Sequence, residues 1–300
     1  MAEKIKTVVI TGPTATGKTA LAVKLARLFP AEIVSVDSRQ VYRGMDIGTG
    51  KDLDEYGEVP YHLIDIADPQ REVYNLARFL RDAYRAVWEI AARGKLPILC
   101  GGTALYLAAL IDGYHLPGGA LPPREKGMPR IRQNPENEPS FEPPFELDAL
   151  LLGVYFPRSE VHARIGARLD SRLTDGLVDE VKHLHELNEV SWEQLEFFGL
   201  EYREVARYLK GECTLSEMRN TLLARIRQFA KRQDIFFRKL EREGHKIHWL
   251  KAGCDPDPCA LIEMFLDGKA LPEPAFRLCD INYGREQRAQ RTPPDTAQTE

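Results

Sequence analysis

The sequence lacks the features of several protein classes. Its five cysteines include no C-x-x-C pair and are odd in number, which argues against both a zinc site and a disulfide framework. No apolar run reaches the length of a membrane span, and no apolar signal segment opens the chain. The net charge of −4 means that a nucleic-acid partner would need a local basic patch. We therefore expect a globular protein of the reducing cytoplasm without membrane contact, and we expect a monomer.

One stretch carries a specific signature of phosphate binding. Residues 12–19 follow the apolar run 7–10 and precede an apolar, helix-forming segment. The spacing G-x-x-x-x-G-K-T lets backbone N–H groups close around a phosphate at the positive end of a helix. Lys18 would reach the phosphate, and the Thr19 hydroxyl would bind Mg²⁺. The eight residues of this phosphate loop are Gly12, Pro13, Thr14, Ala15, Thr16, Gly17, Lys18 and Thr19. A nucleoside triphosphate and an isoprenoid diphosphate fit it equally well.

Two further apolar strands are predicted to end on polar residues. Residues 32–36 lead into Asp37, and residues 96–100 lead into Gly101-Gly102-Thr103. Because parallel strands of an α/β sheet present their carboxyl ends at one edge, we expect Asp37 and Thr103 beside the phosphate loop. Asp37 would act as a general base or in the shell of the metal, with an Asx turn as the structural alternative. For Thr103 the alternative is the N-cap of a helix.

The apolar patterns predict an α/β fold with a P-loop NTPase-like parallel sheet, flanked by helices, and a helical C-terminal region. Six strands are expected, at residues 7–10, 32–36, 62–66, 96–100, 150–156 and 246–250, in an order that the sequence does not reveal. We divide the chain into a core at 1–113, a proline-rich linker at 114–148, the remainder of the core at 149–252 and a weakly ordered tail at 253–300. A mobile lid is the alternative to the linker.

Basic side chains follow one predicted helix at residues 215–243. They form two stripes at helical spacing, which suit a phosphate backbone, although a solvated helix face is the alternative. One stripe holds Arg227, Lys231, Arg238 and Arg242, and the other holds Arg225, Arg232 and Lys239. On an earlier predicted helix, Arg164, Arg168 and Arg172 are four residues apart and share one face.

Four segments together resemble the tRNA dimethylallyltransferases. These are residues 12–19, residues 36–49 (VDSRQVYRGMDIGT), residues 101–103 and residues 229–233 (FAKRQ). The second segment is rarely shared by other P-loop proteins and makes the resemblance specific. The similarity covers residues 5–112 closely and residues 158–250 more loosely.

The resemblance implies that the loop holds dimethylallyl diphosphate and that the prenyl group moves to N6 of the adenine beside the anticodon of tRNA. Asp37 would take the N6 proton, Thr103 would contact the adenine and the diphosphate, and Lys18 with Thr19 and Mg²⁺ would stabilise the leaving group. Arg164 resembles the diphosphate-binding arginine of the family. We assign tRNA binding to Asp37, Ser38, Arg39, Gln40 and Thr103 and, from the basic stripes, to Arg227, Lys231 and Arg232.

The sequence departs from the family in its middle. Members usually insert a helical domain that grips the anticodon stem, where this chain has only residues 114–148. Three alternatives therefore stay open: prenyl transfer to a free adenine nucleotide, a small-molecule P-loop kinase with Asp37 as base, and an inactive RNA-binding paralogue. The basic helix argues against the first, and the sequence shows neither the ATP-adenine pocket nor the arginine lid that the second needs. The intact set of phosphate loop, Asp37 and Thr103 argues against the third.

Overall fold

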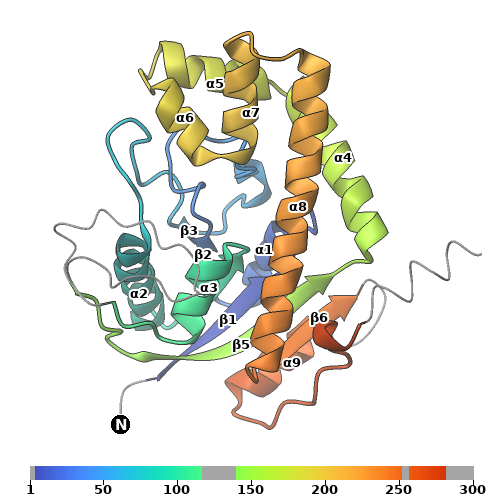
Figure 1. The fold of residues 1–300 in the computed structure, drawn as a ribbon. Helices are drawn as coiled ribbons and strands as arrows, with labels where there is room; N and C mark the ends of the chain where they lie inside the picture. Colours follow the sequence, from blue (N-terminus) through green and yellow to red (C-terminus); the bar gives the residue numbers. More distant parts are fainter. Residues whose placement is uncertain (1–3, 117–139, 252–256, 282–300) are drawn as a thin grey trace, which may run out of the picture.

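A computed structural model describes residues 4–116, 140–251 and 257–281. Its strands form one parallel sheet in the order β3-β2-β4-β1-β5-β6 (Figure 1), which confirms the predicted fold class. The strands are β1 (Lys4–Thr11), β2 (Ala31–Val36), β3 (Tyr61–His62), β4 (Leu96–Gly101), β5 (Glu146–Tyr155) and β6 (Ile247–Lys251). The expected strand at 62–66 ends early, because Leu63 and Asp65 adopt left-handed φ values of 63° and 56°.

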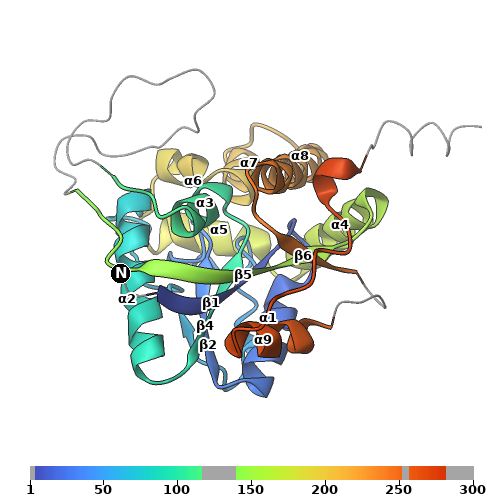
Figure 2. The ribbon, with the colours of Figure 1, turned by 90° about the horizontal axis from the view of Figure 1, so that it is seen from below.

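Helices cover both faces of the sheet. They are α1 (Lys18–Leu28), α2 (Leu76–Ala92), α3 (Ala104–Ile111), α4 (Arg158–Thr174), α5 (Leu177–Glu186), α6 (Trp192–Phe198), α7 (Leu200–Leu209), α8 (Leu215–Arg242) and α9 (Pro258–Leu266), with short 3₁₀ turns η1 (Leu53–Glu55) and η2 (Leu278–Asp280). Helices α1 and α9 pack on one face, and α2, α3 and α8 on the other (Figure 2). Among the described residues, no helix is both long enough and apolar enough to cross a bilayer.

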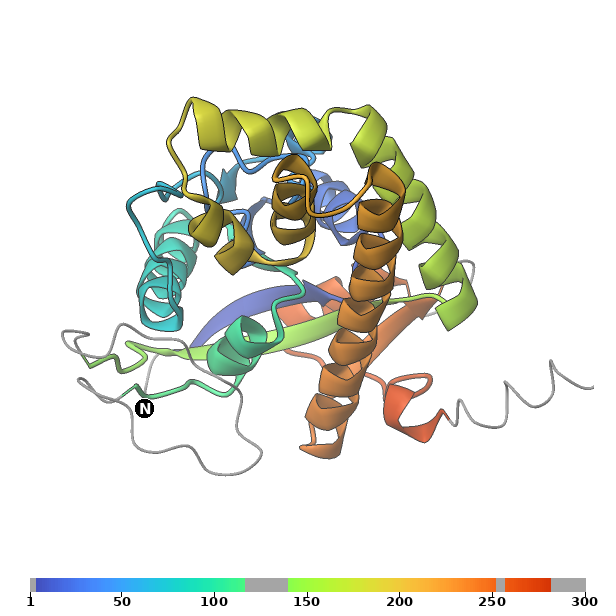
Figure 3. The same ribbon diagram turned by 45° about the horizontal axis from the view of Figure 1, so that its top comes forward.

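Helix α8 links the sheet to a separate group of helices. A capping box starts it: the Thr214 hydroxyl accepts from the backbone N–H of Glu217, whose carboxylate accepts from the N–H of Thr214. Its C-terminal half packs on the sheet, whereas its N-terminal half lies with α4 to α7 at one end of the molecule (Figures 1 and 3). A large cavity lies between this group and the ends of the strands.

The structure corrects two predicted segment boundaries. Residues 258–266 form α9, so the prediction of a weakly ordered tail was wrong there; its apolar spacing covers too few residues to stand out in the sequence. The segment after α9 is held by the carboxylate of Glu241 on α8. This carboxylate accepts from the N–H groups of Leu278 and Cys279 in η2, at 3.0 and 2.7 Å. The predicted linker also extended too far, because β5 begins at residue 146. Residues 117–139 and 282–300 lie outside the described residues.

Candidate active site

The phosphate loop connects β1 to α1 and is shaped by left-handed backbone. Gly12, Ala15 and Gly17 have φ values of 144°, 62° and 80°. A Cβ at Gly12 would lie 2.7 Å from the carbonyl oxygen of Val154 on the neighbouring strand β5, so only glycine fits there. The start of α1 carries no side-chain cap among the described residues, which leaves its N–H groups open to an anion.

Lys18 lies over this loop with its ammonium group bound to protein. Its Nζ donates to the carbonyl oxygen of Pro13 at 2.8 Å, and the Thr16 hydroxyl donates to the same oxygen at 2.8 Å. Burial lowers the pKa of Lys18 from its usual 10.5 to about 8. A bound anion would supply the counter-charge that this lysine lacks in the described residues.

Asp37 and Thr103 lie together beside the loop, as the strand pattern predicted. Asp37 Oδ1 accepts from the N–H groups of Arg39 and Gln40 at 2.8 and 3.3 Å, which is the Asx turn weighed above. Its Oδ2 has no hydrogen-bond partner among the described residues, so the turn and a catalytic role are compatible. Thr103 Oγ1 accepts from the N–H of Ser38 at 3.2 Å and does not cap α3.

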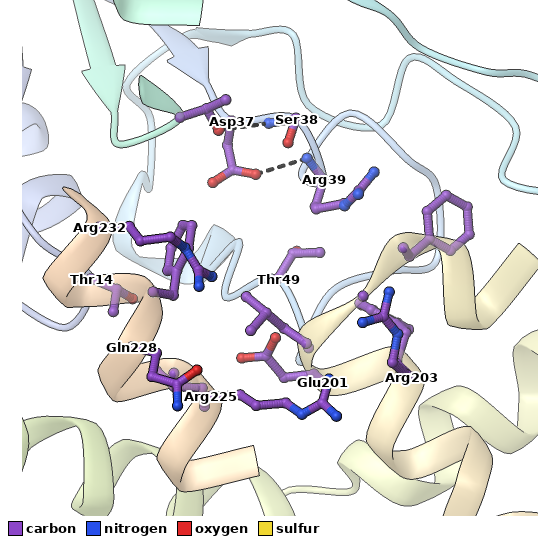
Figure 4. Close-up of a pocket in the computed structure, with 18 of the residues that line it drawn as sticks. Thr14, Asp37, Ser38, Arg39, Thr49, Glu201, Arg203, Arg225, Gln228 and Arg232 are labelled. Carbon is purple, nitrogen blue, oxygen red and sulfur yellow. Dashed lines mark hydrogen bonds between the residues drawn. The ribbon is translucent and has the colours of Figure 1, made fainter. Parts of the chain in front are cut away.

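Two adjoining cavities meet at Asp37. The smaller one, of about 360 Å³, is lined by the phosphate loop and by Arg164 and Arg168 of α4. The larger one, of about 1030 Å³, is lined by the 38–39 turn, the α6–α7 junction and one face of α8 (Figure 4). Both share Thr14, Asp37, Thr49 and Phe229. A group held at the phosphate loop is therefore next to a group held in the larger cavity, with Asp37 between them.

The three arginines of α4 face the site, which argues against a purely solvated face. Arg164 pairs with Glu160 at 3.1 Å and stacks on Phe156, with its guanidinium carbon 3.9 Å from the ring centroid. Arg168 pairs with Asp52 at 2.9 Å, and Arg172 donates to the carbonyl oxygen of Gly48 at 3.2 Å.

A buried ion pair lies in the wall of the large cavity. Arg172 pairs with Glu201 at 3.3 Å, and burial raises the pKa of Glu201. Arg225 of α8 pairs similarly with Glu204 of α7 at 3.1 Å. Neither glutamate was singled out in the sequence, because each lies in a short helix whose pattern gives no sign of the cavity.

The loop at residues 46–52 is a fixed wall of the site. One carboxylate of α5, that of Glu180, accepts from the N–H groups of Asp46 and Gly48 at 2.9 and 3.0 Å and from the Tyr202 hydroxyl at 2.8 Å. Lys51 is fully buried and donates to the Tyr42 carbonyl oxygen at 2.8 Å. The sequence suggested a glycine-rich loop at the site but not the carboxylate that holds it.

Gln233 joins α8 to both glycine-containing loops. Its Oε1 accepts from the N–H of Thr14 at 2.8 Å, and its Nε2 donates to the carbonyl oxygen of Gly102 at 2.9 Å. The side chain is buried, and both ends of its amide are used. A polar residue on the buried face of an amphipathic helix was the available signal for this link.

The two basic stripes of α8 diverge in space. Arg232 lines the large cavity with Arg225, whereas Lys231 lines a separate pocket of about 200 Å³ with Pro13 and His162. Arg227 lines neither of the cavities that meet at Asp37. The predicted tRNA-binding residues of this helix therefore do not line one cavity.

The protein side chains offer little to a metal beyond Thr19. Among the described residues, no group of three or more His, Cys, Asp or Glu side chains could hold a metal ion. Thr19 and Lys18 line the small cavity, where Asp37, Asp52 and Glu55 are the carboxylates. This donor set fits Mg²⁺ that is bound mainly by phosphate oxygens and water.

The fold and site define a P-loop-type transferase, and family models agree. The model described as IPP transferase matches residues 40–140 and 123–240, and the model described as isopentenyl transferase matches residues 5–58. A tRNA dimethylallyltransferase of Geotalea uraniireducens is 46% identical over 298 residues, covering 88% of this chain and 98% of that protein. One from Treponema pallidum is 42% identical, covering 81% and 90%. This chain belongs to the tRNA dimethylallyltransferase family, a family of prenyltransferases.

A solved structure supports the same relationship. The tRNA isopentenylpyrophosphate transferase of Bacillus halodurans has a TM-score of 0.68 and 30% sequence identity, covering 88% of this chain and 96% of that one. The resemblance stated from the four segments is thereby confirmed.

Proposed function

We propose that this chain transfers a dimethylallyl group from dimethylallyl diphosphate to N6 of the adenine adjacent to the anticodon in tRNA. The observation that carries the proposal is the place of Asp37, between a cavity lined by the phosphate loop and a larger cavity lined by arginines. The names of relatives that share over 40% identity with it support the reaction and the acceptor.

The donor diphosphate lies in the small cavity in this proposal. The open N–H groups at the start of α1 and the ammonium of Lys18 bind its oxygens, and Arg164 and Arg168 also line this cavity. Thr19 would hold Mg²⁺ through its hydroxyl, and a bound Mg²⁺ would supply positive charge that stabilises the leaving diphosphate. Lys18 contributes to the same effect, since diphosphate departs only when its developing charge is stabilised.

The acceptor adenine lies in the large cavity, out of its stack in the RNA. The bond from the prenyl C1 to the diphosphate oxygen breaks while a bond from C1 to N6 forms. Asp37 Oδ2 takes the proton that N6 loses, and the two backbone bonds to Oδ1 hold the carboxylate in place. Because Thr103 Oγ1 already accepts from Ser38, its own O–H is left to donate to the adenine or the diphosphate.

The test supplies purified protein with Mg²⁺, labelled dimethylallyl diphosphate and either unmodified tRNA or AMP. We expect label in tRNA, on N6 of the adenine beside the anticodon. Label in AMP alone would move the assignment to a free-nucleotide prenyltransferase, and label in neither would favour the inactive paralogue or the kinase. Omission of Mg²⁺ should abolish transfer if the proposed role of Thr19 is correct.

A further inference from the structure

Arg39 is a cationic side chain in the large cavity without a carboxylate partner among the described residues. Its guanidinium carbon lies 5.7 Å from the ring centroid of Phe197 and 5.5 Å from that of Phe198. Its hydrogen bond is a long one, from Nη2 to the carbonyl oxygen of Phe197 at 3.5 Å. In Figure 4 its guanidinium extends away from the Asp37 carboxylate. Burial lowers the pKa of Arg39, and the nearby Asp37 carboxylate and tyrosines oppose this shift only in part.

Arg203 approaches the same place from α7. Its Nε donates to the carbonyl oxygen of Glu196 at 3.1 Å, and it too has no carboxylate partner among the described residues. Arg39 and Arg203 line the large cavity together with Phe197. Figure 4 shows Arg203 on the same side of the cavity as Arg39. We call Arg39, Phe197 and Arg203 the arginine corner.

The three arginines of α4 that line the two cavities differ from Arg39 and Arg203 in their partners. Arg164, Arg168 and Arg172 each form an ion pair with a carboxylate of the protein. Enclosing a guanidinium without a counter-charge costs free energy, so such a group at a cavity wall is suited to an anionic ligand. Planar guanidinium groups bind phosphate oxygens through paired, charge-assisted hydrogen bonds.

The donor diphosphate is not that ligand. Arg39 and Arg203 line the large cavity and are absent from the lining of the small one, where the phosphate loop lies. The anion at the arginine corner therefore enters with the acceptor.

We infer that Arg39 and Arg203 bind the phosphodiester group that flanks the target adenosine of the acceptor RNA. The inference rests on the proposed function, since it takes the acceptor to be a polynucleotide. Phe197 supports the contact by packing against the guanidinium of Arg39. The arginine corner would then orient the adenosine with N6 toward Asp37, and it would favour a nucleotide chain over free adenosine.

The test compares protein variants with chemically neutralised RNA. A synthetic anticodon stem-loop receives uncharged methylphosphonate linkages one at a time, and kcat/KM is measured with wild type, Arg39→Gln and Arg203→Gln. Loss of one charge-assisted contact should lower kcat/KM about tenfold, whether the charge is removed from the protein or from the RNA. The key result concerns the neutral linkage beside the adenosine. This linkage should lower the kcat/KM of wild type about tenfold relative to the unsubstituted stem-loop, and it should lower the kcat/KM of Arg39→Gln very little.

The matched control is Arg85→Gln. Arg85 is an exposed arginine of α2 that pairs with Asp82 and lines neither of the two cavities. This variant should behave as wild type with every linkage. Two results would overturn the inference. One is that the neutral linkage lowers the kcat/KM of Arg39→Gln by the same factor as that of wild type. The other is that no neutral linkage changes the kcat/KM of wild type. Arg203→Gln gives the same comparison from α7, so the inference can still be decided if Arg39→Gln misfolds.

Two outcomes separate this inference from the proposed function. No prenylation of the unsubstituted stem-loop by wild type would contradict the proposed function itself. Prenylation with additive losses would contradict the arginine corner alone. A third outcome would contradict the phosphodiester assignment. If wild type prenylated AMP as efficiently as the stem-loop, and Arg39→Gln lowered kcat/KM equally for both acceptors, the arginine corner would bind a terminal phosphate.

Discussion

The two cavities that meet at Asp37 are built in different ways. The small one combines side chains with a wall of backbone: left-handed residues at Gly12, Ala15 and Gly17 and the open start of α1 shape that wall before any ligand arrives. The large one is lined by side chains from the 38–39 turn, the 46–52 loop, α6, α7 and α8. A backbone cradle suits a ligand of fixed shape such as a diphosphate, whereas converging side chains suit an extended polyanion.

The two cavities also differ in how their basic side chains are paired with carboxylates. In the small cavity Arg164 and Arg168 are paired with carboxylates, and Lys18 donates to the loop itself. In the large cavity Arg39 and Arg203 have no carboxylate partner among the described residues. In the proposed reaction, the diphosphate would neutralise Lys18 on the donor side, and an RNA phosphate would neutralise Arg39 and Arg203 on the acceptor side.

The largest effect should come from the residue that both cavities share. Asp37→Asn keeps an oxygen that can accept from Arg39 and Gln40, so the turn is preserved while the general base is lost. We expect kcat to fall by about 10²–10⁴, with the dissociation constant for dimethylallyl diphosphate nearly unchanged. Single-turnover rates and donor titration measure the two quantities separately.

Asp37→Ala serves as the comparison, since it removes both the turn and the base. It should lower kcat at least as far and should also lower the melting temperature. If Asp37→Asn weakened donor binding as much as it slowed turnover, Asp37 would serve the metal and the proposed division between the cavities would be wrong.

Both cavities were only partly predictable from sequence, for different physical reasons. The phosphate loop, Asp37 and Thr103 were found because local strand patterns deliver them to one edge of a parallel sheet. Glu180, Glu201 and Gln233 were not assigned contacts, because each has a partner 29 or more positions away in the chain, as in the bond from Gly48 to Glu180. Periodicity describes the face of a helix but not the partner that the face meets.

The same limit explains the errors in the fold. All six strands were predicted, with β3 cut short by the left-handed backbone at Leu63 and Asp65. Helix α9 was missed since its nine residues carry too little pattern, and Pro258 at its start also suits a loop. The basic stripes of α8 were located correctly along the helix, but their directions depend on how α8 packs.

The second prediction concerns pH and tests the donor side. Because burial lowers the pKa of Lys18 to about 8, the lysine of the donor-free protein loses its proton above that pH. Diphosphate binds the protonated form, so donor affinity should be flat below pH 8 and fall about tenfold per pH unit above it. Titration calorimetry with dimethylallyl diphosphate over this range measures the effect.

Lys18→Met is the control for this titration, and it should bind donor weakly with no such pH dependence.

The stability of the protein should change with pH in the opposite direction to donor affinity. Since the folded pKa lies below the usual 10.5, the unfolded chain binds more protons between pH 8 and 10.5, and the donor-free protein should become more stable as pH rises through that window. Equal donor affinity at pH 7 and pH 9 would show that Lys18 keeps its charge in the empty loop.

The smallest expected effect distinguishes the two faces of α8. Lys231 and Arg232 are neighbours in sequence, yet Arg232 lines the large cavity and Lys231 lines the pocket beside Pro13. Each substitution to Gln removes one exposed positive charge, so the overall electrostatic change is matched. Arg232→Gln should weaken tRNA binding about threefold and lower the slope of log affinity against log salt by about 0.7–0.9 units. Lys231→Gln should leave the slope unchanged.

The comparison is informative because a general electrostatic attraction would not distinguish the two residues. Long-range steering of RNA depends on net charge, which both variants change equally, whereas counterion release depends on which phosphate a side chain touches. Equal loss of slope in the two variants would mean that RNA spans both faces of α8, as the basic stripes alone suggested. A larger loss with Lys231→Gln would place the RNA outside the large cavity and would contradict the assignment of that cavity to the acceptor.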